Sequence, residues 1–417
     1  MRDAILIIGA GIFQEPAIRI AKEMGLEVIA TDIRRDAPGL KYADHVEMVS
    51  KFDIERTIAI AESYTHMVNL RGVMTIGTDV SYTVACVAKA LGLPCIDPES
   101  ALMATNKALM RRRLKACGVP VPEFRTASSR EEAMELACEV GFPLVIKPVD
   151  NMGARGIRRL ENLMDLLEWF SIAQKNSRSN EVILEEYMSG PEVSIDTLVY
   201  DNEVYLLTIA DRHIAMPPYF VELGHTLPST LPEEAQQDVF DVMKKGIKAL
   251  GITLGASKGD IKVTPEGARI GEMTARMSGG FHCQYTDPLA TGMNSIRAAI
   301  HLAIGNPLPI EDITPKWHKT AVERAILAGP GVVMDITGVD EALEIDGVKH
   351  VFLNVSEGDL VEPLCSNIGK PGHIIAVGDT HDEAVYAVQR ALDTIKIHTS
   401  KPAELEPASV HHILQKQ

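Results

Sequence analysis

The sequence predicts a parallel α/β domain, then a larger α+β region, then a third region rich in antiparallel strands. Residues 4–9, AILIIG, form an apolar run that leads into a glycine turn, a helix ending near Gly25 and a second apolar run, LEVIATD. A strand–helix–strand unit of this kind belongs to a parallel sheet. Later runs, EVILEEYM, EVSIDTLVYD and EVYLLTIADR, are separated by hairpin-like breaks, which indicate antiparallel pairing. From His318 onward, AVERAILAGPGVV, HVFLNVSEGD and HIIAVGDT alternate with turns before a helix, HDEAVYAVQRALDTI.

The composition and charge exclude several classes of protein. A chain of 417 residues is too long for a single core and predicts two to four domains. The net charge of −16 argues against a nucleic-acid binder. The N-terminus lacks the pattern of a signal peptide, and no segment approaches the roughly 20 apolar residues of a membrane span. Six scattered cysteines indicate reduced thiols, so we expect a cytoplasmic protein without membrane contact.

The glycine turn at residues 9–11 partly matches a dinucleotide-binding fingerprint. Asp32 follows about twenty residues later, but the third glycine expected near position 14 is replaced by Gln14. A tight turn inherited with the fold is therefore favoured over a nicotinamide site. A further strand, GVMTIGTD, and a further helix complete the first domain, which we place at residues 1–97.

A lysine beside a glycine loop is a candidate for phosphate binding. Lys147 ends the apolar strand FPLVIK and precedes the loop DNMGARGI, residues 150–157. Loop amides can cradle phosphate oxygens while the ammonium group neutralises their charge. The alternative is a hairpin turn in which Gly153 and Gly156 only supply a positive φ.

A second lysine, Lys107, lies in a basic helix predicted over residues 100–117. Ser100 is its expected cap and Gly118 its stop. The alternative to phosphate binding is a solvated, charged helix face.

The segment ILEEYMSGPEVSID begins as a strand and breaks at Ser189-Gly190-Pro191. Where a chain leaves a sheet, unpaired backbone groups can bind a planar base, and an acid a few residues later can accept two ribose hydroxyls. From composition alone, a surface strand with Glu185, Glu186 and Glu192 facing solvent is the simpler interpretation.

A hairpin predicted over Ser257 to His282 places two acids together. If its loop is Pro265-Glu266-Gly267, then Thr264 pairs with Ala268 and Asp260 stands directly opposite Glu272. Like charges at such a position repel. A dication between them removes the repulsion, because Mg²⁺ takes one or two carboxylates together with phosphate oxygens.

Together these motifs resemble the ATP-grasp superfamily. Lys107, "FPLVIKP", "DNMGARGI", "LEEYMSGPEVSID" and "GDIKVTPEGARIGEMTARMSGG" occur in its order and spacing. The resemblance implies an ATP-grasp fold with a pre-ATP-grasp α/β domain and a C-terminal region similar to the biotin-carboxylase-like branch. The domains are then expected at residues 1–97, 98–317, with a small lid subdomain at about 120–190, and 318–417.

The resemblance also implies a nucleotide site. The two lysines would contact the phosphates, two loop glycines would close over the triphosphate, three hinge residues would read adenine, and one acid would bind the ribose. In that order, the expected ATP-binding residues are Lys107, Lys147, Gly153, Gly156, Glu185, Glu186, Met188 and Glu192.

For metal and catalysis, the resemblance implies that Asp260 and Glu272 hold two Mg²⁺ ions, for which Mn²⁺ is expected to substitute. Arg276 is similar to the family arginine that steadies a transferred phosphoryl group or an acyl phosphate. Counting by twos places Glu272, Thr274 and Arg276 on one strand face. Thr274 stands where many members have Asn, so one ion is expected to be held less firmly.

The segment ADRHIAMPPYFVELGHTLPSTLPEE, residues 210–234, resembles bacterial L-amino acid ligases. His225 matches a histidine that lies near the reacting carboxylate in that group, whereas His213 is a weaker candidate; either could instead be a surface or core histidine. Tyr219 and Phe220 are candidates for a side-chain pocket or plain core. The expected activity is ATP-dependent joining of a carboxylate and an amine through an acyl phosphate, with an amino-acid substrate and release of ADP and phosphate.

Other interpretations compete with this one. A biotin carboxylase subunit is disfavoured because TARMSGGF replaces its signature NTRxQVEH. An ATP-grasp carboxylase or a phosphoribosylglycinamide-type purine ligase remains an alternative, as does a non-catalytic nucleotide-binding protein. Homodimers are common in the resemblance group, so we expect a homodimer.

Overall fold

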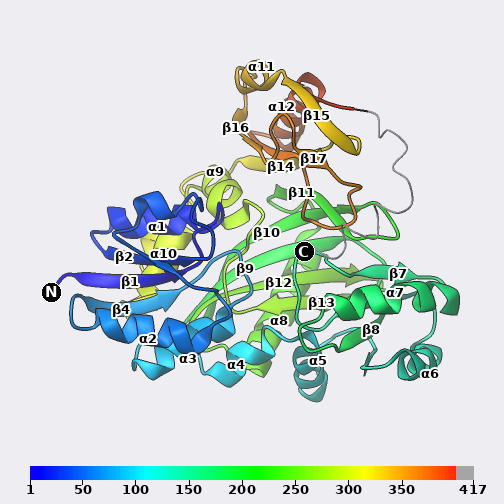
Figure 1. Cartoon of the computed structure of the whole chain (residues 1–417), viewed down its shortest axis with the longest axis horizontal. Coiled ribbons are helices and arrows are strands. Elements are labelled where there is room, and N and C mark those ends of the chain that lie inside the picture. Colours follow the sequence, from blue (N-terminus) through cyan, green and yellow to red (C-terminus); the bar gives the residue numbers. More distant parts are fainter. Residues whose placement is uncertain (401–417) are drawn as a thin grey trace.

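The computed structural model describes residues 1–400 and begins with a parallel four-stranded sheet of order β3-β2-β1-β4 (Figure 1). β1 is almost fully buried, which explains its unbroken apolar run. The elements of this part are β1 (Asp3–Ile8), α1 (Glu15–Glu23), β2 (Glu27–Asp32), β3 (His45–Met48), α2 (Ile54–Tyr64), β4 (Asn69–Met74) and α3 (Ser81–Ala90). The predicted parallel sheet is therefore confirmed.

The basic helix expected over residues 100–117 is two helices, α4 (Pro98–Met103) and α5 (Lys107–Ala116). Their caps differ from the predicted Ser100. Asp97 accepts a hydrogen bond from the Glu99 N–H, and Asn106 accepts one from the Leu109 N–H. Each cap satisfies an N–H group that has no partner within its helix. α5 therefore begins at Lys107, directly after its cap Asn106.

A second sheet, of order β5-β8-β6-β7, is antiparallel and lies to the right in Figure 1. Helices α6 and α7 pack on it around a separate apolar core. Its elements are β5 (Phe124–Ala127), α6 (Arg130–Val140), β6 (Leu144–Pro148), β7 (Arg158–Leu160), α7 (Leu163–Lys175) and β8 (Val182–Glu186).

The largest sheet has eight strands in the order β13-β12-β9-β10-β11-β14-β18-β16. α8 packs against β13 and β12, and a left-handed Gly251 ends it. Along the sequence, the elements from β9 to α10 are β9 (Glu192–Tyr200), β10 (Glu203–Ala215), β11 (Val221–Leu227), α8 (Glu233–Leu250), β12 (Gly255–Thr264), β13 (Gly267–Thr274), the π-helix η2 (His282–Thr286), α9 (Asp287–Thr291) and α10 (Ser295–Ala303).

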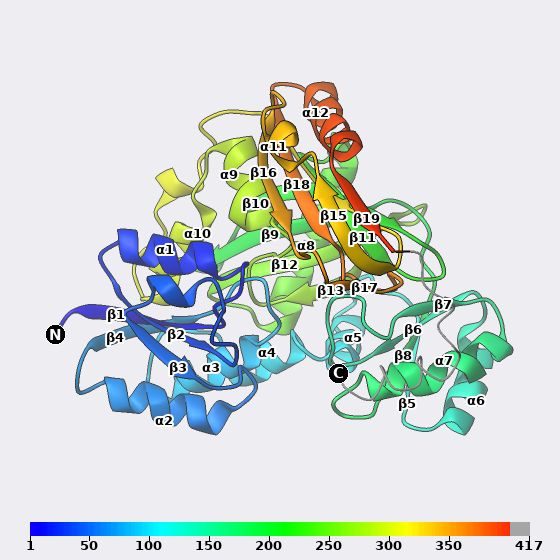
Figure 2. The ribbon, with the colours of Figure 1, turned by 45° about the horizontal axis from the view of Figure 1, so that its top comes forward.

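The C-terminal region continues this sheet, because β14 pairs with β11 and with β18. α12, which has a Thr380–Glu383 capping box, packs on β18 and β14 (Figure 2). A separate sheet of order β17-β15-β19 lies beside it. The elements are β14 (Thr320–Ile326), β15 (Gly331–Thr337), α11 (Val339–Leu343), β16 (Val348–Leu353), β17 (Leu360–Val361), β18 (Gly372–Gly378), α12 (His381–Thr394) and β19 (Lys396–Thr399).

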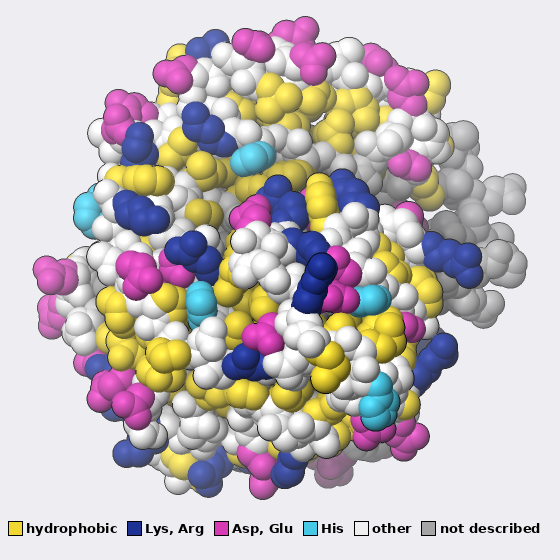
Figure 3. Space-filling view, turned by 90° about the vertical axis from the view of Figure 1, so that its left-hand side faces the viewer, with side chains coloured by type: hydrophobic (Ala, Val, Ile, Leu, Met, Phe, Trp, Pro, Cys, Tyr) yellow, Lys and Arg dark blue, Asp and Glu magenta, His cyan; other side chains and the backbone are white. Residues whose placement is uncertain are grey.

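The surface has no simple charge polarity on the face that Figure 3 shows, where acidic and basic side chains are interspersed. Among residues 1–400, none of the helices combines the length and the apolar character needed to cross a bilayer. The expected tail beyond residue 400 lies outside the described residues.

Candidate active site

A cavity of about 710 Å³ opens where the parallel sheet, the small antiparallel sheet and the eight-stranded sheet meet. It brings together most of the residues predicted from the sequence. Those that line it are Lys147, Gly153, Glu185, Glu186, Met188, Glu192, His225, Asp260, Glu272 and Arg276. The other two, Lys107 and Gly156, are not part of the lining.

Asp260 and Glu272 are directly opposed in the β12–β13 hairpin, as predicted, but the predicted loop was wrong. Thr264 pairs with Gly267, so the loop contains two residues rather than three. An irregularity between Asp260 and Ile261, where Ile261 pairs with Ile270, restores the opposition. A β-bulge adds one residue to one strand, and here it shifts the acids into register.

The two carboxylates have different cationic partners. The Lys258 Nζ lies 2.5 Å from Asp260 Oδ2, and Arg212 contacts the same oxygen at 3.0 Å. Lys107 is 3% exposed and places its Nζ 2.9 Å from Glu272 Oε1. Although burial alone would raise the pKa of Glu272, Lys107 and Lys258 hold it well below its usual value. Glu272 is therefore kept ionised.

Two further oxygens at this hairpin, Asp260 Oδ1 and Thr274 Oγ1, are buried and have no hydrogen-bond partner among residues 1–400. Such orphaned polar atoms are uncommon in folded proteins and fit a missing ligand. Within residues 1–400 no cluster of three or more His, Cys, Asp or Glu side chains is arranged to hold a metal. The arrangement suits Mg²⁺, which takes few protein ligands when phosphate oxygens complete its shell.

Lys147 and Glu185 form a buried ion pair, with Nζ and Oε2 2.5 Å apart. Arg111 donates to the other oxygen of Glu185 at 2.7 Å. The backbone of Glu185 is paired on both sides, to Val145 and Phe124. The side chain of Glu185 is therefore engaged in holding Lys147, and its expected part in reading a base stays a prediction.

Met188 lies two residues after the end of β8. In the described part of the chain, its N–H donates to no other backbone or side-chain group. The Glu186 carboxylate is engaged by Arg269 at 3.0 Å, so its side chain is also occupied. Glu192 accepts from Arg212 and lies 3.4 Å from Lys262 Nζ.

Arg212, which the sequence interpretation missed, links three acids at the centre of the cavity. It contacts Glu192, Glu222 at 2.7 Å and Asp260 at 3.0 Å. Burial would lower the pKa of Arg212, but these acids raise it well above its usual value. Because β10 carries Arg212 next to β9, only the sheet pairing reveals the contact with Glu192.

Arg276 lies past the end of β13, so the prediction that it shares the strand face of Glu272 was wrong. It turns toward the first domain instead. Its Nε and Nη2 donate to Asp79 Oδ1 at 2.9 and 2.5 Å. Asp79 follows β4, and both residues line the cavity. Their contact joins two segments far apart in sequence.

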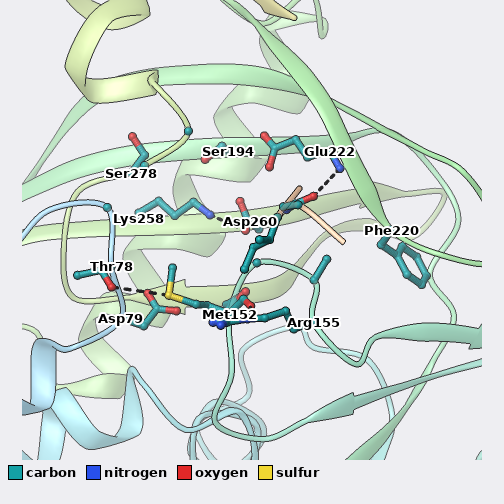
Figure 4. Close-up of a pocket in the computed structure, with 18 of the residues that line it drawn as sticks. Thr78, Asp79, Met152, Arg155, Ser194, Phe220, Glu222, Lys258, Asp260 and Ser278 are labelled. Carbon is teal, nitrogen blue, oxygen red and sulfur yellow. Dashed lines mark hydrogen bonds and ion pairs between the residues drawn. The ribbon is translucent and has the colours of Figure 1, made fainter. Parts of the chain in front are cut away.

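The loop at 150–157 lies between the first domain and the C-terminal region. Its Gly153 carbonyl accepts from the Asn367 N–H at 3.0 Å, and Met152 Sδ lies 3.8 Å from Thr78 Oγ1 (Figure 4). Gly156 has φ +70°, and a Cβ there would lie 2.9 Å from Asn176 Cβ. Gly156 is thus required by close packing.

His225 is buried against an acid that the sequence interpretation also missed. Its Nε2 lies 2.7 Å from Thr286 Oγ1 and its Nδ1 3.5 Å from Glu323 Oε2. His373 Nδ1 lies 2.5 Å from the other Glu323 oxygen. Although burial opposes it, the hydrogen bonds from His225 and His373 lower the pKa of Glu323 to about 2. Pairing of β11 with β14 places His225 opposite Glu323.

The weaker histidine candidate, His213, is not part of the cavity lining. It lies 2.9 Å from Thr226 Oγ1, and burial together with Arg324 lowers its pKa to about 4. Of the aromatic pair, Phe220 lines the cavity, whereas Tyr219 packs on Trp169 with ring centroids 5.7 Å apart.

The glycine turn at 9–11 borders the cavity, but its polar groups are used within the protein. Asp32 accepts from the Ala10 N–H at 3.0 Å and from the Arg34 N–H at 2.9 Å. A Cβ on Gly9 would lie 3.3 Å from Gln14 Oε1, so Gln14 covers the turn. These contacts hold the turn together within the first domain, and the preference for a structural turn over a nicotinamide site stays a prediction.

Comparison with known proteins agrees with this geometry. The ATP-grasp domain family matches residues 140–284, and the family described as L-amino acid ligase C-terminal domain 2 matches residues 324–400. An uncharacterized protein of Sinorhizobium fredii is 29% identical over 361 residues, covering 85% of this chain and 74% of that protein. A formate-dependent phosphoribosylglycinamide formyltransferase of Ignicoccus hospitalis is 25% identical over 415 residues, covering 94% of this chain and 95% of its own length.

Among solved structures, the L-amino acid ligase from Bacillus licheniformis superposes with a TM-score of 0.82 at 23% identity. The superposition covers 96% of this chain and 100% of that one. At this identity the similarity establishes the fold alone. The predicted ATP-grasp fold, with its parallel first sheet and antiparallel remainder, is confirmed.

Proposed function

We propose that this chain, whose residues 140–284 match the ATP-grasp domain family, is an ATP-dependent carboxylate–amine ligase that acts on an amino acid. It would form an amide through an acyl phosphate and release ADP and phosphate. The observation that carries the proposal is the opposed pair Asp260 and Glu272 beside Lys107, Lys147 and Arg276. Acids, lysines and an arginine around one cavity are the groups that stabilise phosphoryl transfer.

We propose that Lys107 and Lys147 bind the nucleotide phosphates and that the loop at 150–157 covers them. The hydrogen bond of Lys107 to the Asn151 carbonyl, at 2.7 Å, supports this because it ties the lysine to the loop. The N–H of Met188, which has no partner within residues 1–400, is suited to adenine. Glu186 remains a candidate for the same base, although its own N–H donates to the Glu123 carbonyl at 2.9 Å. Glu192 remains the candidate for the ribose.

Asp260 and Glu272 would hold Mg²⁺, with Thr274 as a weaker candidate ligand because its hydroxyl is buried and unpartnered. When bound, Mg²⁺ neutralises phosphate charge and orients the phosphate oxygens. We also propose that Mn²⁺ can replace it, since it accepts similar oxygen ligands.

Arg276 would steady the transferred phosphoryl group, and Asp79 fixes the direction of its guanidinium. His225 would lie at the reacting carboxylate or the amine, with its ring oriented by Glu323 and Thr286. A histidine whose second nitrogen faces a carboxylate is held in one tautomer and orientation.

The match of residues 324–400 to the L-amino acid ligase C-terminal domain supports amino acids as substrates. A phosphoribosylglycinamide-type ligase or an ATP-grasp carboxylase is the second candidate, supported by the Ignicoccus relative. The decisive experiment measures phosphate release with ATP·Mg over all amino-acid pairs, followed by mass spectrometry of the products. A dipeptide supports the first candidate, and turnover only with phosphoribosyl amines or bicarbonate supports the second. No ADP release with any of them would leave a non-catalytic nucleotide-binding protein.

We further propose domains at residues 1–97, 98–317 and 318–417, although the eight-stranded sheet continues across the last boundary. We also propose a homodimer located in the cytoplasm. The six cysteines, all free, support a reducing compartment.

A further inference from the structure

A group of cations lines the part of the cavity where the first domain contacts the loop at 150–157. Arg34, Lys51 and Arg155 all line the cavity there. Figure 4 shows Arg155 and Met152 on the loop, beside Thr78 and Asp79 of the first domain. Arg34 and Lys51 belong to the first domain and are not among the residues assigned above to the nucleotide or the metal, whereas Arg155 lies on the loop proposed to cover the phosphates.

Lys51 is the central member of this group. Its Nζ donates to Thr78 Oγ1 at 2.7 Å, and no carboxylate within residues 1–400 forms an ion pair with it. Burial lowers the pKa of Lys51, and the nearby charges of Arg155 and Arg178 lower it further. A half-buried lysine without a counter-ion is unfavourable unless an anion joins it.

Arg155 resembles Lys51 in its surroundings. Its Nε donates to the Met152 carbonyl at 2.9 Å, and it has no carboxylate partner in the described part of the chain. Burial lowers the pKa of Arg155, and Arg178 adds to the effect. The Arg178 guanidinium lies 4.3 Å from the centre of the Phe52 ring, so it borders the same wall.

The acids on this wall are already occupied. Asp32 accepts hydrogen bonds from the Ala10 and Arg34 N–H groups, and Asp79 holds Arg276. Asp79 and Asp32 each raise the pKa of Lys51. Burial and the charge of Arg155 lower that pKa, and each of these two effects is larger than the effect of either acid. The wall therefore carries uncompensated positive charge that faces the cavity.

We propose that Lys51 and Arg155 bind an anionic group, a carboxylate or a phosphate, on the amine substrate. This rests on the proposed ligase function. The ATP phosphates are assigned to Lys107 and Lys147, and the phosphoryl group that stays anionic in the acyl phosphate is assigned to Arg276. An anion that remains on the first-domain wall is then most simply a second ionised group of the amine that attacks. The geometry thus assigns the acceptor to amines that carry a permanent negative charge.

The test is calorimetric binding of amines in the presence of ADP·Mg, which does not require turnover. The probes are the standard amino acids, their neutral amides, and aminomethylphosphonate. The variants are Lys51→Met and Arg155→Met, with Lys89→Met as control because Lys89 is exposed and paired with Asp97 at 3.0 Å.

We expect the wild type to bind at least one anionic amine more tightly than its amide. Each site variant should weaken that binding by about tenfold or more, the loss expected for a hydrogen bond to a charged group. ADP binding by Lys51→Met and amine binding by the Lys89→Met control should both remain within twofold of the wild type. Tighter binding of amino acids than of aminomethylphosphonate would identify the anion as a carboxylate. Tighter binding of aminomethylphosphonate would identify it as a phosphate.

Two outcomes would overturn the proposal: no anionic amine is preferred over its amide, or Lys51→Met loses ADP affinity instead of amine affinity. A separate phosphate-release assay distinguishes failure of the ligase function from failure of the anion site. Binding that depends on Lys51 without any phosphate release would refute the reaction and leave the anion site intact.

Discussion

Asp260 and Glu272 stand opposite one another across the β12–β13 hairpin, yet each carboxylate is held by its own cation. Lys258 and Arg212 hold Asp260, and Lys107 holds Glu272. Two like charges in this position would otherwise repel. The lysines and arginine therefore offset this repulsion and hold the two acids close together, in an arrangement suited to a dication.

We expect Glu272→Gln to reduce phosphate release by about a hundredfold or more, because metal charge stabilisation is worth several kcal/mol. The amide still accepts a hydrogen bond from Lys107, so the fold should persist. Steady-state phosphate release and circular dichroism measure the two effects. Glu266→Gln, in the exposed turn of the same hairpin, is the matched control. A fully active Glu272→Gln enzyme would refute the metal assignment.

The hairpin also illustrates how far the sequence could predict the site. Alternating apolar residues and the turn chemistry predicted the hairpin and the opposed acids. They did not predict the two-residue loop or the compensating irregularity at Asp260, because a bulge depends on packing across the sheet. The correct pair was therefore reached through an incorrect register.

Other parts of the site were beyond local sequence patterns. Arg212, Asp79 and Glu323 act through partners on other strands or in another domain. An isolated acid after a strand, such as Asp79, carries no spacing signal that names Arg276 as its partner. Motifs whose members are close in sequence, such as the loop at 150–157, were predicted, whereas long-range ion pairs required the structure.

We expect Asp79→Asn to lower kcat by about tenfold, since the Arg276 guanidinium loses a charged hydrogen-bond acceptor. ATP affinity should change less than twofold, because Arg276 is expected to act mainly during phosphoryl transfer. Single-turnover kinetics and nucleotide titration separate the two quantities. Asp36→Asn, at an exposed position of the same domain, is the control. Loss of ATP affinity with unchanged kcat would show that Arg276 serves the bound nucleotide instead.

We expect Glu323→Gln to lower kcat and to lower the free energy of unfolding at neutral pH. The folded pKa of Glu323 is about 2, below its ordinary value, so its stabilisation is present above pH ~4.5 and is lost as the pH falls toward 2. At neutral pH the variant should lose about 3 kcal/mol, and its stability should depend less on pH in that acid range. Thermal unfolding between pH 2 and 7 measures this. The exposed Glu357→Gln should behave as the wild type, and a variant that retains the full acid dependence would contradict the role of Glu323.

The buried Asp287 gives the opposite pH dependence. It accepts hydrogen bonds from Ser295 and from Thr291, the latter at 3.1 Å, and burial raises its pKa to about 7. A raised carboxyl pKa stabilises the folded state fully below the unfolded value, and that contribution is lost as the pH rises through 7. Asp287→Asn, which imitates the protonated acid, should match the wild type near pH 4 and exceed its free energy of unfolding by up to about 4 kcal/mol at pH 8. Urea unfolding at both pH values tests this, with the exposed Asp346→Asn as control. Equal stability of the Asp287 variant and the wild type at pH 8 would mean that Asp287 is readily ionised in the folded protein.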